Sequence, residues 1–175
     1  MLDLRQQLES LARGRVCFVG LGNPDFGDDG FGVRMAEDLH QTGVPHVVVA
    51  GVSPERWLSR LADPQFAHVV FLDAVEFGGA PGSVVLLNGR EAAARFPQVS
   101  THKISLSLLA EWIESNGATH MWLLGVQPES IRESAALSPA VRESARMIRG
   151  LLLETLSLPA RNITADSSSE VEAYA

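Results

Sequence analysis

The sequence holds very little cysteine and comparatively little basic charge. Cys17 is the one cysteine among 175 residues, which excludes an internal disulfide framework and a cysteine-rich zinc site. The 14 Lys and Arg residues stand against 21 Asp and Glu, giving a net charge of −7. Proteins that grip a nucleic-acid backbone carry a basic face instead. We therefore expect no nucleic-acid partner.

Long hydrophobic runs are also missing. The uncharged runs Val69–Leu72 and Met121–Val126 fall far short of the roughly 18 residues that a membrane-spanning helix needs. The N-terminal stretch carries an acid early and has no apolar core of the kind found in signal peptides. These absences predict a cytoplasmic protein with no membrane partner, in which Cys17 is a buried structural thiol.

What is present is the composition of a globular domain. Hydrophobic residues make up 46% of the chain and charged residues 20%, which is too apolar for disorder and too charged for a membrane protein. At this length about two-thirds of the unfolded surface can be buried. We expect a single domain over residues 1–160, with residues 1–14 as an N-terminal extension forming a short helix outside the core. A flexible C-terminal tail is expected over residues 161–175.

Short apolar runs alternate with helical stripes along this domain. Helices are predicted near residues 29–41, 54–61, 104–116 and 139–156, and five runs predict strands: Val16–Leu21, His46–Ala50, His68–Asp73, Ser83–Leu87 and His120–Val126. This alternation is typical of an α/β fold, a mostly parallel sheet with helices on both faces. The fourth run follows the third through a glycine-rich turn, so we expect an antiparallel hairpin between them.

Carboxylates gather where the predicted strands end, which is the edge at which such sheets bind ligands. They are Asp25, Asp28, Asp29, Glu55, Asp73 and Glu76. Like charges at one edge repel one another unless a cation neutralises them. The same rule sorts the histidines: His46, His68 and His120 mark strand starts at the opposite edge, and His40 ends a helix. His102 precedes a helix, so it alone can face the crevice.

The first loop fits neither of two phosphate-binding motifs. Asp25 stands where a dinucleotide fingerprint needs its third glycine, and Asp28-Asp29 replace the Lys-Ser/Thr of a P-loop. One of these acids could simply cap the following helix. However, Gly30 and Gly32 fall in the first helical turns, where each costs up to about 1 kcal/mol relative to Ala. A close backbone approach explains them better than helix stability does.

A cation site is the interpretation that remains. Asp29, Asp73 and His102 form a mixed oxygen and nitrogen set, which suits a borderline divalent metal such as nickel, zinc or cobalt. Three protein ligands leave coordination positions open for water or for ligands from a partner.

The motifs around these residues resemble those of the hydrogenase maturation endopeptidases, over roughly residues 16–150. Four motifs carry the resemblance, in order and in register: Gly22-Asn23-Pro24-x-x-Gly27-Asp28-Asp29-Gly30-x-Gly32, Leu72-Asp73-Ala74, Thr101-His102-x-x-x-Leu106 and Gly125-x-Gln127-Pro128. The resemblance implies a three-layer αβα sandwich of phosphorylase/hydrolase-like type with a mostly parallel five-stranded sheet. It also implies that Asp29, Asp73 and His102 are the catalytic, nickel-contacting residues.

The function implied by the resemblance is proteolytic. Such an enzyme removes a C-terminal extension from the precursor of a [NiFe]-hydrogenase large subunit after nickel insertion, so that precursor is the expected partner. Nickel is then recognised in the substrate, and another divalent metal could replace it in vitro. Two alternatives stay open. One is a nickel-checkpoint chaperone that binds without cutting. The other is a peptidyl-tRNA hydrolase, whose family also opens with Gly20-Leu21-Gly22-Asn23-Pro24 but needs a histidine that residues 25–39 lack.

Overall fold

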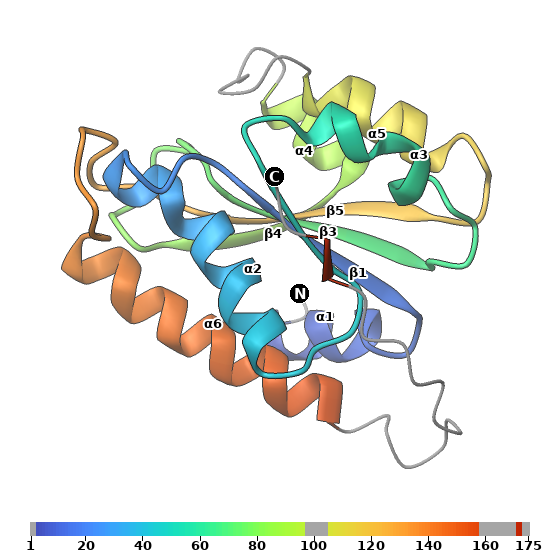
Figure 1. Cartoon of the computed structure of the whole chain (residues 1–175), viewed down its shortest axis with the longest axis horizontal. Helices are drawn as coiled ribbons and strands as arrows, with labels where there is room; N and C mark the ends of the chain where they lie inside the picture. Colours follow the sequence, from blue (N-terminus) through green and yellow to red (C-terminus); the bar gives the residue numbers. More distant parts are fainter. Residues whose placement is uncertain (1–2, 97–104, 158–170, 173–175) are drawn as a thin grey trace.

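A computed structural model of the chain describes residues 3–96, 105–157 and 171–172. A six-stranded sheet in the order β4-β5-β3-β1-β2-β6 forms its centre, with helices on both faces (Figure 1). The strands are β1 (Val16–Leu21), β2 (Val47–Gly51), β3 (His68–Ala74), β4 (Val84–Asn88), β5 (His120–Val126) and β6 (Val171–Glu172). The α-helices are α1 (Leu4–Leu11), α2 (Phe31–Gln41), α3 (Leu58–Leu61), α4 (Gly89–Arg95), α5 (Leu106–Glu114) and α6 (Pro139–Ser157), and two 3₁₀ turns are η1 (Gly27–Gly30) and η2 (Pro54–Trp57).

The predicted mostly parallel sheet is confirmed, but the predicted hairpin is wrong. Strand β4 runs antiparallel to β5, with Val84 opposite Val126, whereas β3 pairs along its whole length with β5. The burial of the strands gives the reason. Every residue of β4 is half-buried, which suits the edge of the sheet, while β3 is buried from its second residue onward and needs a neighbour on each side.

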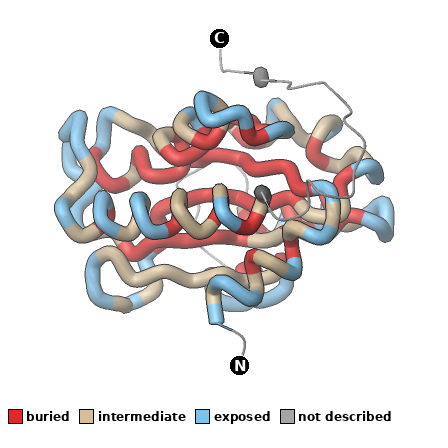
Figure 2. Tube along the Cα trace, turned by 90° about the horizontal axis from the view of Figure 1, so that it is seen from below, coloured by how far each residue is buried: buried red, intermediate tan, exposed pale blue. Residues whose placement is uncertain are grey.

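The helices cover the sheet in two layers and make the fold a three-layer sandwich. Side chains of α1, α2 and α6 pack on one face, and those of α3, α4 and α5 on the other. Successive strand residues serve opposite faces: Phe18 belongs to the first cluster and Val19 to the second, as the period of two requires. Figure 2 shows the buried strands between helices whose outer turns are exposed.

The two ends of the chain differ from expectation. Helix α1 is present as predicted, yet it does not lie outside the core, because Leu8 and Leu11 are buried in the first cluster. The helix packs against α6, and Arg5 forms a salt bridge of 2.8 Å with Glu154 there. From the segment predicted as a tail, Val171–Glu172 pairs in parallel with β2 as a sixth strand. Among the described residues, no helix is both long and apolar enough to cross a membrane.

Candidate functional site

The carboxyl ends of four parallel strands meet at one edge, and the start of α2 backs directly onto two of them. A Cβ atom on Gly32 would lie 1.9 Å from the carbonyl oxygen of Leu72 and 2.5 Å from that of Leu21. Only glycine permits this approach, since such contacts with backbone atoms cannot be relieved by a side-chain movement. The predicted reason for Gly32 is thus confirmed, and η1 is fixed beside the ends of β1 and β3.

Asp29 lies in η1 and is held by its own loop. The backbone N–H of Asn23 donates a hydrogen bond of 2.7 Å to Asp29 Oδ2. The turn between them depends on Gly22, whose φ of 107° favours glycine and whose added Cβ would meet the Asp29 carbonyl oxygen at 1.8 Å. The half-buried carboxylate therefore has one oriented oxygen, and the loop cannot shift without breaking that bond.

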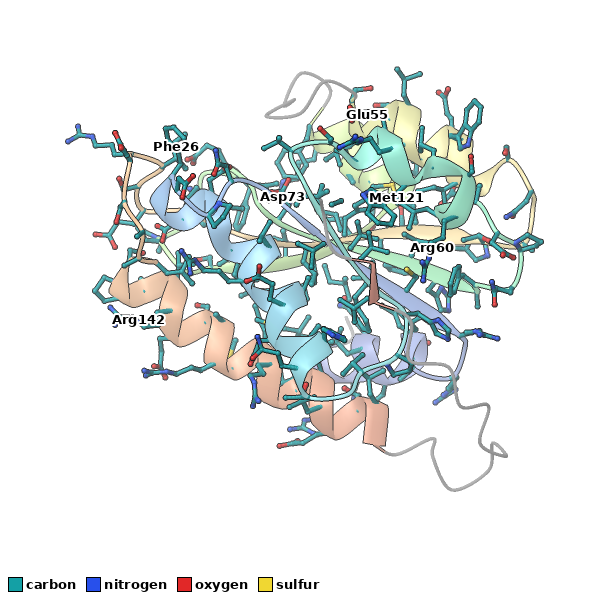
Figure 3. All side chains as sticks on the ribbon, in the orientation of Figure 1. Phe26, Glu55, Arg60, Asp73, Met121 and Arg142 are labelled. Carbon is teal, nitrogen blue, oxygen red and sulfur yellow. The ribbon has the colours of Figure 1, made fainter. Side chains whose placement is uncertain are left out.

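Asp73 reaches the same edge from the neighbouring strand. It is the last residue but one of β3, pairs in register with Gly125 of β5 and is 3% exposed. Because η1 packs against β3, the structure brings Asp29 and Asp73 to one part of the edge. Figure 3 shows Asp73 in the interior of the molecule, whereas Phe26 lies near its periphery.

The third predicted site residue, His102, lies outside the described residues. Within the part of the chain that the structure describes, no three His, Cys, Asp or Glu side chains form a group that could hold a metal ion. Asp29 and Asp73 carry carboxylate oxygens, but their role as metal ligands and the complete set of three stay predictions.

The neighbouring acid, Asp28, has a different role that the sequence did not reveal. Its side chain is fully buried, and its Oδ2 accepts hydrogen bonds from the N–H groups of Glu129 at 2.8 Å and Ser130 at 3.1 Å. Its Oδ1 accepts one from the N–H of Ser138 at 2.7 Å, the residue before α6. Asp28 therefore connects the loop after β1 to the segment that follows β5.

Gln127 makes a similar connection to the loop after β3. Its Oε1 accepts hydrogen bonds from the N–H groups of Phe77 at 2.9 Å and Gly79 at 3.1 Å, and its Nε2 donates one of 2.6 Å to Glu76. Gln127 is 3% exposed, so its side chain is held in the interior while its partners lie in the partly exposed loop. Gln127 of the Gln-Pro motif thus has a structural role, and the Glu76 carboxylate accepts a hydrogen bond from a neutral amide.

The histidines predicted to be structural lie at the opposite edge, as expected. His68 begins β3 and His120 begins β5, with ring centroids 6.1 Å apart. His68 Nδ1 accepts a hydrogen bond of 3.2 Å from the indole N–H of Trp122. Burial, with the nearby His120 adding to it, lowers the pKa of His68, so its imidazole favours the neutral form.

Cys17 is buried within β1, away from the carboxyl edge. Burial raises the pKa of its thiol to about 12. A thiol that stays protonated is a poor nucleophile, and the predicted structural role of Cys17 agrees with this.

Comparisons with known proteins converge on one kind of protein. Residues 33–155 match a family model described as hydrogenase maturation protease. The hydrogenase 2 maturation protease of Escherichia coli is 28% identical over 73% of this chain and 81% of its own length. A putative hydrogenase maturation protease of Methanocaldococcus jannaschii is 35% identical, over 39% of this chain and 47% of that relative, so the matched region spans about half of it. The crystal structure of the [NiFe] hydrogenase maturation protease HycI from Thermococcus kodakarensis superposes with a TM-score of 0.75 at 31% identity, covering 86% of this chain and 99% of that one.

Proposed function

Because the chain belongs to the hydrogenase maturation protease family, we propose that it cleaves a C-terminal extension from a [NiFe]-hydrogenase large-subunit precursor once nickel is in place. It is a peptide-bond hydrolase, and in this proposal the nickel arrives as part of the substrate. The observation that carries the proposal is that Asp73 at the end of β3 and Asp29 in η1, which follows the neighbouring strand β1, lie at one edge of the sheet. Oxygen ligands on two separately fixed elements can meet a metal whose other ligands belong to the precursor.

The two carboxylates differ in a way that suits this task. Asp29 is half-exposed and, in the described part of the chain, only its Oδ2 accepts a hydrogen bond. Its Oδ1 is thus available to the substrate, either as a ligand or as a base for the attacking water. Asp73 is almost fully buried, so its charge acts in a low-dielectric setting where attraction to a cation is strong. His102 completes the proposed set as a neutral nitrogen ligand.

Processing of the precursor in its two metal states tests the proposal. The protein is incubated with nickel-loaded and nickel-free large-subunit precursor, and the released peptide is detected by mass spectrometry. Release is expected with nickel only, and it should be lost in Asp29→Ala, Asp73→Asn and His102→Ala. Glu111→Ala, an exposed acid on α5, is the matched control and should process normally. Binding of the precursor without release of a peptide would contradict the protease and indicate a checkpoint chaperone.

The proposed location is the cytoplasm. The free, buried thiol of Cys17 supports this location, because it agrees with a reducing compartment.

A further inference from the structure

A pocket of about 520 Å³ opens between α2 and the carboxyl end of β2, next to the proposed site. Its walls come from the loop after β1, from α2 and from the end of β2. The lining includes Asn23, Asp25, Val33, Glu37, Val49 and Val52. None of them is among the three proposed site residues, so this cavity has no role in the function described so far.

One wall of the pocket is the same loop that holds Asp29. Asn23 lines the pocket and its N–H donates to Asp29 Oδ2 at 2.7 Å. Gly22 also lines it and lies against the Asp29 backbone. A group bound in the pocket therefore touches residues that contact Asp29, and strand β1 separates the pocket's strand β2 from β3, which carries Asp73.

The chemistry of the lining selects one kind of group. Val33, Val49 and Val52 give apolar walls, and Val52 is 46% exposed. Asp25 and Glu37 add two exposed carboxylates, and no Lys or Arg occurs among the described lining residues. Apolar walls that end in carboxylates match a Lys or Arg side chain, whose methylene stem packs on apolar surface while its charge stays at the rim.

Nearby basic side chains do not neutralise these two acids. Arg34, one turn before Glu37 on α2, donates hydrogen bonds to the carbonyl oxygens of Pro24 at 3.1 Å and Ala135 at 2.9 Å. Arg149 pairs with Asp38, the neighbour of Glu37. Both arginine cations are thus directed at other oxygens, so neither of them neutralises Asp25 or Glu37.

We propose that this pocket binds a Lys or Arg side chain of the substrate polypeptide, at a position removed from the scissile bond. The inference rests on the proposed function, because it takes the precursor as the molecule that approaches Asp29. The pocket would then contribute to affinity and register, while Asp29 and Asp73 meet the metal.

Charge reversal at Glu37 tests the pocket through binding rather than cleavage. In an Asp73→Asn background, which leaves the bond between Asn23 and Asp29 in place and is expected to prevent processing, the affinity for nickel-loaded precursor is measured by titration calorimetry. Glu37→Gln should weaken binding about threefold and Glu37→Lys about tenfold, the range expected when a partly exposed ion pair is lost or reversed. Glu111→Lys, the same reversal on the opposite helical layer, should change the affinity less than twofold. Binding of Glu37→Lys within twofold of the unreversed protein overturns the proposal.

A charge swap then tests the identity of the occupant. Each Lys or Arg in the C-terminal region of the precursor is replaced by Glu in turn, and binding to the Glu37→Lys protein is measured again. One replacement should restore the affinity to within about threefold, whereas rescue by none overturns the basic-side-chain occupant. The two proposals fail differently: a protein that binds the precursor in this charge-dependent way but never releases a peptide would refute the protease and leave the pocket in place.

Discussion

Asp28 offers the sharpest test of how the site is built, because a fully buried carboxylate there holds three backbone N–H groups. Hydrogen bonds to a charged group contribute about 1.5–3 kcal/mol each. Glu129 and Ser130 are exposed, so their N–H groups can regain water when the carboxylate is removed, whereas Ser138 is half-buried. We therefore expect Asp28→Ala to lower the free energy of unfolding by about 3–5 kcal/mol.

The asparagine variant separates charge from shape at the same position. Asp28→Asn keeps one acceptor oxygen and replaces the other with an NH₂ group, which must face either Ser138 or the pair Glu129 and Ser130. We expect it to cost roughly half as much as the alanine variant, about 2 kcal/mol. Asp25→Ala, which removes an exposed carboxylate from the same loop, should stay within about 0.5 kcal/mol of the wild type.

Urea unfolding followed by circular dichroism measures these differences, with the slope checked for constancy so that the midpoints report stability. Hydrogen exchange should show faster exchange at the amides of Glu129, Ser130 and Ser138 in both Asp28 variants. A loss below about 1 kcal/mol in Asp28→Ala, or an asparagine variant as stable as the wild type, would refute the reasoning that the charged carboxylate holds this loop.

Three further predictions concern other parts of the fold. Gly32→Ala should lower the free energy of unfolding, measured in urea, by about 3 kcal/mol or more, because its Cβ would meet two carbonyl oxygens. Gly150→Ala, in open space on α6, should raise it by about 0.5–1 kcal/mol. Equal effects of the two substitutions would contradict the close approach at Gly32. The pKa of His68 is lowered in the folded state, whereas in the unfolded chain this histidine has its ordinary pKa of about 6.5. Near and below that pH the unfolded chain therefore binds more protons than the folded protein, and the free energy of unfolding should fall as the pH drops from 7.5 to 5.5. His68→Gln should show a smaller fall between these two values, and an unchanged fall would count against the burial of the imidazole. The Cys17 thiol, with a pKa of about 12, should react with iodoacetamide at neutral pH only in urea; rapid labelling of the native protein, detected by mass spectrometry, would be inconsistent with its burial.

Much of the fold could be predicted because the strands that are buried on both faces are continuous apolar runs. Strand β1 has the predicted bounds, and β3 and β5 begin at the predicted histidines. The pairing of β4 could not be read in the same way. A turn of suitable length permits a hairpin with β3, but β5 competes for that position from a distant part of the chain and offers a longer buried strand. Such a competition is decided by tertiary packing, not by local sequence.

Helix α4 and the burial of α1 both depart from the prediction, for different reasons. Helix α4 begins at a capping box in which Asn88 and Glu91 satisfy each other's backbone N–H groups, a signal that is local and present in the sequence. The apolar side of α1 is short, with Leu8 and Leu11 as its buried residues. Only the position of α6 shows that this side is covered.

At the site, the predicted strand ends correctly indicated the edge at which the acids lie. They did not indicate the separate role of each acid. Asp28 and Asp29 are adjacent in the 3₁₀ turn η1, and successive side chains in such a turn point about 120° apart. One of them had to face away from the edge, yet the partners of Asp28 lie 101 to 110 residues further along the chain. No local rule could have named them. The structural role of Gln127 could not be predicted for the same reason, because its hydrogen bonds to Phe77 and Gly79 connect two loops that are far apart in the sequence.

These two buried side chains together connect the three loops of the edge through hydrogen bonds. Asp28 joins the loop after β1 to the segment after β5, and Gln127 joins that segment to the loop after β3. If the nickel arrives with the substrate, as proposed, it cannot organise its own ligands beforehand, so the protein must hold Asp29 and Asp73 in place by other bonds. Ligands that are already held in position lose less conformational entropy on binding than mobile ones do. It follows that Asp28→Asn, which leaves both proposed ligands intact, should still weaken binding of the nickel-loaded precursor more than binding of the nickel-free form.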